Sequence, residues 1–380
     1  MNELIILFVL AFCIFISPFL ARLARLPVAP VEIALGAFFG LAGLLPESEL
    51  FSLTAKLGFY YLMFLAGMHI DWRELVATPR PTILFAASYL AFLYVVSGIC
   101  AAFSHNPFFV FTLVSLMSVG MLGTLAKDYG ASKPWLAVAM LTGCAGEAVS
   151  IVLITFAEAY VKFGLGARLA INIAYLAAFV LFCVLVFKGV EVLFWWFPKL
   201  ARTLMPQYDK EEKDIRLSLA LFLAVVAAML WLGIEIAFGA FVAGSFIATF
   251  FSHKADLNRR LGSFGFGFLV PIFFVFVGSR LTWAALSDFD ILKLAFLVVA
   301  FTIILRTVGA LIFAREVPPK ERALFGFSLS MPLTLLIAAA TLGLEAAVIE
   351  QNTYFALILA SVFEAVIVTS TINFICLRKS

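Results

Sequence analysis

Apolar runs of about 20 residues, separated by short polar or Pro/Gly-containing connections, follow one another along the whole chain. A run of this length matches the thickness of a bilayer core, where a helix satisfies all of its own backbone polar groups. The pattern predicts an all-α polytopic membrane protein with about thirteen transmembrane helices. The predicted spans lie near residues 2–21, 28–45, 50–69, 82–104, 107–126, 134–158, 168–189, 215–232, 234–252, 263–279, 290–313, 321–343 and 352–376.

The basic residues predict the orientation of these helices. Most of them fall in alternate connections, such as those with Arg22, Lys127 and Arg315. Because cytoplasmic loops are rich in Lys and Arg, we expect the N-terminus outside and the C-terminus in the cytoplasm, in the cell (inner) membrane of a bacterium. The first run follows Glu3 rather than a basic segment and has no small-residue cleavage site, so we expect a retained membrane helix and not a signal peptide.

Composition narrows the function classes. Of 380 residues, 64% are hydrophobic and 13% charged, which excludes a soluble globular or a disordered chain. The net charge of +3 gives no strongly basic surface, so we expect no nucleic-acid partner. The five cysteines lie in apolar runs without metal-like spacing, and His69, His105 and His253 are dispersed. We therefore expect neither an enzyme nor a cofactor.

The longest interruption, residues 190–214, divides the chain into halves at 1–189 and 215–380. Trp195 and Trp196 precede a charged run there, which predicts an interfacial linker helix, although a plain cytoplasmic linker fits as well. The similar layout of the two halves suggests an inverted repeat. Since the chain ends soon after its last span, no soluble regulatory domain is expected.

Three ionisable residues lie deep within apolar runs: Glu147, Arg306 and Glu364. A charge at that depth costs a few kcal/mol unless it faces a cavity or a partner, so each is a functional candidate. Glu32, by contrast, lies in a short span, and we expect its carboxylate to reach the membrane surface.

Glu147 is the principal candidate for binding both the proton and a metal cation. On a helix, Gly143 and Ser150 share its face, which predicts space for water or an ion beside the carboxylate. The alternative is a structural carboxylate that is hydrogen-bonded to a neighbouring helix.

Two spans contain helix-breaking residues at mid-depth. One break is predicted near 117–124, with Ser118, Gly120 and Thr124, and the other near 328–334, with Ser330 and Pro332. Helix breaks expose partial charges and unpaired backbone groups that can bind ions beside a central carboxylate. A proline kink without function remains the alternative for either segment alone.

An ordered series of motifs resembles the monovalent cation/proton antiporter superfamily, nearest its Kef-like branch. The motifs lie at residues 64–75, 118–120, 146–152, 237–244, 271–280 and 306–310. The resemblance implies an inverted-repeat fold in which two unwound helices cross beside the acidic motif. It also implies a homodimer that exchanges protons for Na⁺ or K⁺ by alternating access.

The sequence departs from that pattern at three positions. Gly146 stands where family members carry the first of two acidic or amide residues, and Met117 or Leu122 replaces a threonine. Arg306 stands where the Kef-like branch has a lysine. The expected site therefore consists of Glu147 with Ser118, Gly146 and Ser150, while Arg306 and Glu364 supply supporting charge. Glu364 is expected to replace part of the missing acid, or else to be a neutral structural acid.

These observations favour a cation/proton antiporter. The alternative is a protein of the same fold that has lost antiport and acts as a channel, a sensor or a carrier of an organic ion.

Overall fold

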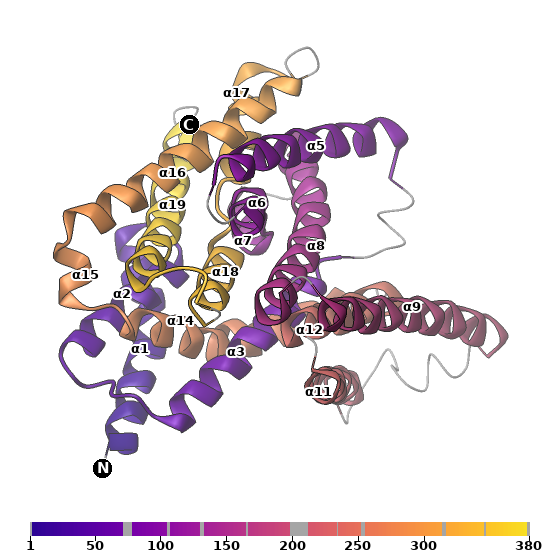
Figure 1. Cartoon of the computed structure of the whole chain (residues 1–380), viewed down its shortest axis with the longest axis horizontal. Coiled ribbons are helices and arrows are strands. Elements are labelled where there is room, and N and C mark those ends of the chain that lie inside the picture. The colour runs from indigo at the N-terminus through magenta and orange to yellow at the C-terminus, as the bar shows by residue number, and fades with distance from the viewer. Residues whose placement is uncertain are drawn as a thin grey trace. The chain divides into compact units, whose positions relative to one another are not determined.

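The computed structural model describes residues 2–70, 78–104, 107–129, 133–164, 166–197, 212–233, 235–251, 255–313, 317–345 and 347–377, with some side chains within these ranges left out. Throughout these ranges the regular elements are helices (Figure 1). Ten of the described helices are long and apolar enough to cross a membrane, and three shorter apolar helices accompany them. The prediction of an all-α polytopic membrane protein is confirmed.

The described residues divide into two compact units. The first unit comprises Met1–Ser52, Thr78–Ala157 and Phe274–Ser380 and holds the candidate site. Its helices are α1 (Asn2–Ala24), α2 (Val28–Leu41), α5 (Arg80–Ala102), α6 (Pro107–Ser115), α7 (Gly120–Tyr129), most of α8 (Pro134–Phe163) and of α14 (Val270–Ser279), α15 (Trp283–Ser287), α16 (Phe289–Gly309), η2 (Ala310–Phe313), α17 (Pro319–Ser328), α18 (Leu333–Glu345) and α19 (Gln351–Leu377).

The second unit comprises Leu53–Ala77 and Glu158–Phe273. It contains most of α3 (Glu49–Gly67), then α9 (Ala167–Trp196), α11 (Lys213–Leu232), α12 (Ile236–Phe250), α13 (Ala255–Phe264) and η1 (Gly265–Leu269). Helices α3 and α12 cross at two glycines. A Cβ atom at Gly67 would lie 2.0 Å from the Phe241 carbonyl oxygen, and one at Gly244 would lie 1.9 Å from that of Phe64. Such backbone contact is the membrane-helix packing that only glycine allows.

The surface of these helices matches a lipid environment. Large apolar side chains such as Phe8, Phe182 and Phe296 are exposed on α1, α9 and α16. A water-facing helix would carry polar residues there, whereas the hydrocarbon of a bilayer solvates apolar ones. Trp195 and Trp196, at the end of α9, are also exposed, as is common for aromatic residues at a membrane interface.

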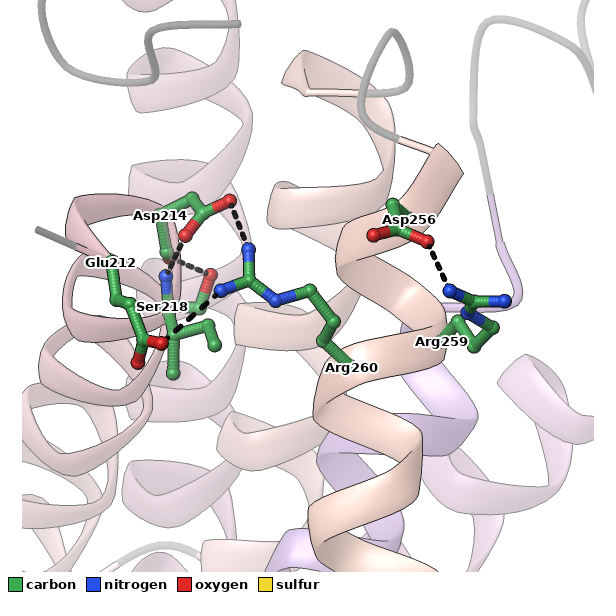
Figure 2. Close-up of polar contacts among 7 residues, drawn as sticks. Glu212, Asp214, Ser218, Asp256, Arg259 and Arg260 are labelled. Carbon is green, nitrogen blue, oxygen red and sulfur yellow. Dashed lines mark hydrogen bonds and ion pairs between the residues drawn. The ribbon is translucent and has the colours of Figure 1, made fainter. Parts of the chain in front are cut away.

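An ionic contact joins two helices in the second unit (Figure 2). Arg260 of α13 lies 3.2 Å from the Asp214 carboxylate and 3.6 Å from that of Glu212, both at the start of α11. Asp214 is buried, so Arg260 supplies the partner that its charge needs. In the part of the chain that the structure describes, the neighbouring Arg259 pairs with Asp256 on its own helix (Figure 2).

The connection near residues 190–214 is described only in part. Residues 190–196 continue α9 and do not begin a separate linker helix, while residues 198–211 lie outside the described part of the chain. The interfacial linker at 190–214 and the division into halves at 1–189 and 215–380 therefore stay predictions.

Candidate functional site: two helix breaks beside a buried carboxylate

The first break lies at residues 116–119, between α6 and α7. Three of its backbone groups are satisfied by side chains from other helices. The Met117 N–H donates to Ser150 Oγ at 3.0 Å, the Val119 N–H donates to Glu147 Oε2 at 3.3 Å, and the Leu116 carbonyl accepts from Arg306. Since a buried backbone polar group without a partner is costly, these side chains stabilise the non-helical segment.

The second break lies at residues 329–332, between α17 and α18. Pro332 has no N–H and cannot continue a helix, and its carbonyl accepts the first bond of α18 from the Leu336 N–H. At the other side, Ser328 and Ser330 donate to the Phe325 and Gly326 carbonyls near the end of α17. Both breaks were predicted, and α18 packs against both α6 and α7, so the two broken helices meet.

The limits of the first break differ from the prediction near 117–124. Gly120 is the first residue of α7, so it lies beside the break and not within it. Thr124 belongs to the second turn of α7, and its side chain is outside the described residues. The position of the break follows the side chains that hydrogen-bond to its backbone, and the glycines alone do not predict its first and last residues.

Glu147 lies on α8, fully buried, with both carboxylate oxygens facing the first break. The Ser118 hydroxyl donates to Oε1 at 2.9 Å, and the Val119 N–H donates to Oε2. Ser118 Oγ is also 2.8 Å from Thr334 Oγ1, in the first turn of α18. Because the single Ser118 hydrogen goes to Glu147, Thr334 must be the donor in this second bond. A chain of hydrogen bonds therefore runs from Thr334 through Ser118 to Glu147 and joins both broken helices.

Gly146 lies against the break rather than beside an open cavity. A Cβ atom at Gly146 would be 2.4 Å from Met117 Sδ and 3.0 Å from Met117 Cβ. Met117, one of the two candidates for the residue in place of the family's threonine, thus fills the volume that a side chain at 146 would need. Gly143 is also closely packed, because a Cβ there would be 2.7 Å from Leu122 Cδ1. Room for water or an ion beside the Glu147 carboxylate stays a prediction.

Ser150 is occupied by backbone groups. Its hydroxyl donates to the Gly146 carbonyl at 2.7 Å and accepts from the Met117 N–H. Its position next to Glu147 was predicted, and its contacts are those of a residue that supports the break. Direct cation binding by Ser150 or by the Gly146 backbone stays a prediction.

Arg306 and Glu364 are both fully buried in the first unit, on α16 and α19. Arg306 reaches the Leu116 carbonyl of the first break, and the Tyr89 hydroxyl donates to the Arg306 backbone carbonyl at 3.3 Å. Neither of these contacts was predicted, and neither was the role of Thr334. Thr334 had a signal, since it follows the Pro332 break directly, whereas Tyr89 has none in its local sequence.

Glu32 contradicts the expectation that its carboxylate reaches the membrane surface. It is 3% exposed and accepts a 3.2 Å hydrogen bond from Ser17 of α1. Its depth in the fold is set by the packing of α1 on α2, which the length of a single apolar run does not reveal.

Within the described residues, no group of three or more His, Cys, Asp or Glu side chains could hold a metal ion. Metal-cation binding by Glu147 stays a prediction.

Comparisons with known proteins identify the family of the chain. The chain is 29% identical over 393 residues to the "Putative Na(+)/H(+) antiporter YjbQ" of Bacillus subtilis, covering 96% of this chain and 61% of that protein. It is 24% identical over 333 residues to the "Na(+)/H(+)-K(+) antiporter GerN" of Bacillus cereus, covering 86% of this chain and 83% of that protein.

The solved structure of the sodium proton antiporter MjNhaP1 from Methanocaldococcus jannaschii, at pH 8, superposes with a TM-score of 0.69 at 14% identity. It covers 98% of this chain and 97% of that one, so the two share a fold. The family model "Sodium/hydrogen exchanger, transmembrane" matches residues 8–378, and the chain therefore belongs to the sodium/hydrogen exchanger family.

Proposed function

We propose that this protein exchanges protons for a monovalent cation across the membrane, and that Glu147 binds the proton and the cation in turn. The observation that carries the proposal is a fully buried carboxylate whose hydrogen-bond donors both belong to a helix break. A transporter needs a site that changes partners without unfolding, and helix breaks at mid-membrane supply polar groups for this purpose.

The chemistry of the site fits a competition between the two ions. The ionised Glu147 carboxylate accepts from Ser118 and Val119 and attracts a cation, for which the Ser118 and Thr334 hydroxyl oxygens are suitable hard ligands. When Glu147 is protonated, its own O–H can donate to Ser118, and the hydrogen bonds toward Thr334 can reverse direction. The neutral carboxyl group no longer holds the cation, so the two ions exclude each other at one site.

Several finer assignments accompany this proposal. We propose Na⁺ as the cation, with K⁺ as the second candidate, because relatives named for both ions are similar to the chain over most of its length. The motif series supports the Kef-like branch and a homodimer, and the basic residues in alternate connections support an N-terminus outside the cell membrane. Gly120, Thr124, Ser330 and Pro332 then serve the breaks, and Arg306 and Glu364 supply charge beside them.

The function is tested in vesicles that contain the purified protein and a pH-sensitive dye. We expect an added Na⁺ or K⁺ gradient to move protons in the opposite direction, whereas choline, which is too large for one carboxylate and two hydroxyls, gives no signal. Comparison of Na⁺ with K⁺ at equal concentrations identifies the preferred ion. Proton movement that is independent of the cation would contradict antiport and favour the alternative of a channel or sensor.

Ser118→Ala is expected to weaken apparent cation affinity about tenfold, because it removes the hydroxyl between Glu147 and Thr334. A hydrogen bond to a charged group is worth about 1.5–3 kcal/mol, and about 1.4 kcal/mol corresponds to a factor of ten. The concentration dependence of exchange measures this change. Ser330→Ala is the matched control, since that hydroxyl donates to the Gly326 carbonyl in the other break. Equal effects of the two variants would argue against a specific role for Ser118.

A further inference from the structure

Arg306 and Glu364 form an incompletely paired couple inside the first unit. Both side chains are fully buried, and α16 packs along α19 (Figure 1). Arg306 uses Nη2 for the Leu116 carbonyl, while its Nε and Nη1 and both Glu364 carboxylate oxygens have no hydrogen-bond partner in the described part of the chain. The three guanidinium hydrogens on Nε and Nη1 and a carboxylate cannot be left unpaired in a membrane interior without a large cost.

The surroundings of Glu364 suit a protonated acid in this arrangement. Its polar neighbours are Arg306 and Thr302, which lie one turn apart on the same face of α16. The Thr302 hydroxyl donates its hydrogen to the Val298 carbonyl, so toward Glu364 it can only accept. A protonated Glu364 can donate to Thr302, whereas an ionised Glu364 needs the donors that Arg306 leaves free.

Among the described residues, no other charged group takes the place of Arg306. The remaining elements packed against α19 are α2, α17 and α18. Their titratable and charged residues are Glu32, which is bonded to Ser17, then Lys320, Glu321 and Arg322 in the first turn of α17, and Glu345 at the last residue of α18. On α16 itself, Asp290 and Lys293 lie in the first two turns, three turns or more from Arg306.

We propose that Glu364 is a second proton-binding site, and that loss of its proton draws Arg306 from the Leu116 carbonyl to the Glu364 carboxylate. The proton passes to solvent and Arg306 stays charged throughout, so the step changes one O–H bond and the partner of one guanidinium. Leu116 is the first residue of the break whose Ser118 and Val119 donate to Glu147. The state of Glu364 therefore reaches Glu147 through Arg306 and the break.

The coupling to Glu147 rests on the proposed function, whereas proton binding by Glu364 does not. The first test is therefore infrared difference spectroscopy of the purified protein in lipid, recorded against pH. We expect the carboxylic C=O signal to contain a component that Glu364→Gln removes and that Glu147→Gln leaves in place. Glu32→Gln is the matched control, because it removes another buried carboxyl with a different partner. If Glu364→Gln removes no component, the proposal is overturned even where exchange is intact.

The second test uses Arg306. In Arg306→Gln, the Glu364 component should titrate at a higher pH, because the carboxylate has lost its cationic partner. In vesicles, Glu364→Gln should reduce exchange and change the shape of its pH profile. The double variant Glu364→Gln, Arg306→Gln should be at least about fivefold more active than the product of the two single effects. Equality with that product, or an unchanged infrared titration in Arg306→Gln, would refute the link between the two residues. Absence of exchange in the unmodified protein would instead refute the proposed function.

Discussion

Glu147→Gln is expected to reduce cation-dependent proton movement to the background of empty vesicles. The amide has the size of the carboxyl group and its oxygen can still accept from Ser118, but it carries neither a charge for the cation nor an exchangeable acidic proton. Its NH₂ group faces the Val119 N–H, which is the only opposed pair of donors that the change introduces. We therefore expect the free energy of unfolding, measured by thermal unfolding, to change by about 1 kcal/mol at most.

Two further variants make this result specific. Glu147→Asp keeps an acid with a shorter reach, and we expect partial exchange with a displaced pH optimum. Glu32→Gln changes the other buried carboxylate with a hydrogen-bond partner in the first unit, and we expect exchange to continue. Substantial exchange by Glu147→Gln, or loss of exchange in Glu32→Gln alone, would remove Glu147 from the centre of the mechanism.

Gly146→Asp is expected to destabilise the protein by about 3 kcal/mol, although it restores the residue that the family commonly carries. The new Cβ would be 2.4 Å from Met117 Sδ, and Met117 is fully buried, so the two side chains cannot share the space. Thermal unfolding in detergent measures this decrease in stability.

Met117→Thr in the same chain should relieve that loss. The shorter side chain frees volume and brings the hydroxyl that the family usually has in this helix, so the double variant should be about 1–2 kcal/mol more stable than the sum of the single effects predicts. Gly189→Ala is the control for adding a methyl group to a helix, because nothing lies within 4 Å of a Cβ there. Additive effects at 146 and 117 would contradict the shared volume.

The sequence predicted the parts of the fold that depend on local pattern. The apolar runs placed the spans, Pro332 placed the second break, and the depth of Glu147 in its run placed it next to the first. The packing between helices could not be predicted in this way. Leu122 packs against Gly143, and Ser17 pairs with Glu32, because the packing of one helix on another brings these side chains together.

The limits of the first break also show that local sequence predicts a break, whereas contacts between helices decide which residues it contains. Two glycines and two hydroxyls suggested an interruption near 117–124, yet the helix resumes at Gly120. The non-helical residues are those whose backbone groups find side-chain partners, and Arg306, one of those partners, comes from 190 residues further along the chain. A single sequence contains the residues of this contact but gives no sign of their pairing.

The hydrogen bond between Ser118 and Thr334 also affects when the site can form during synthesis of the chain. The two residues are separated by 216 positions, which a ribosome needs roughly 10–40 s to translate. Glu147 follows Ser118 by only 29 positions, so its carboxylate can find the Ser118 hydroxyl while the rest of the chain is still being made. Early pairing would lower the cost of burying the Glu147 carboxyl group during membrane insertion. The site would be completed only when the last helices leave the translocation machinery.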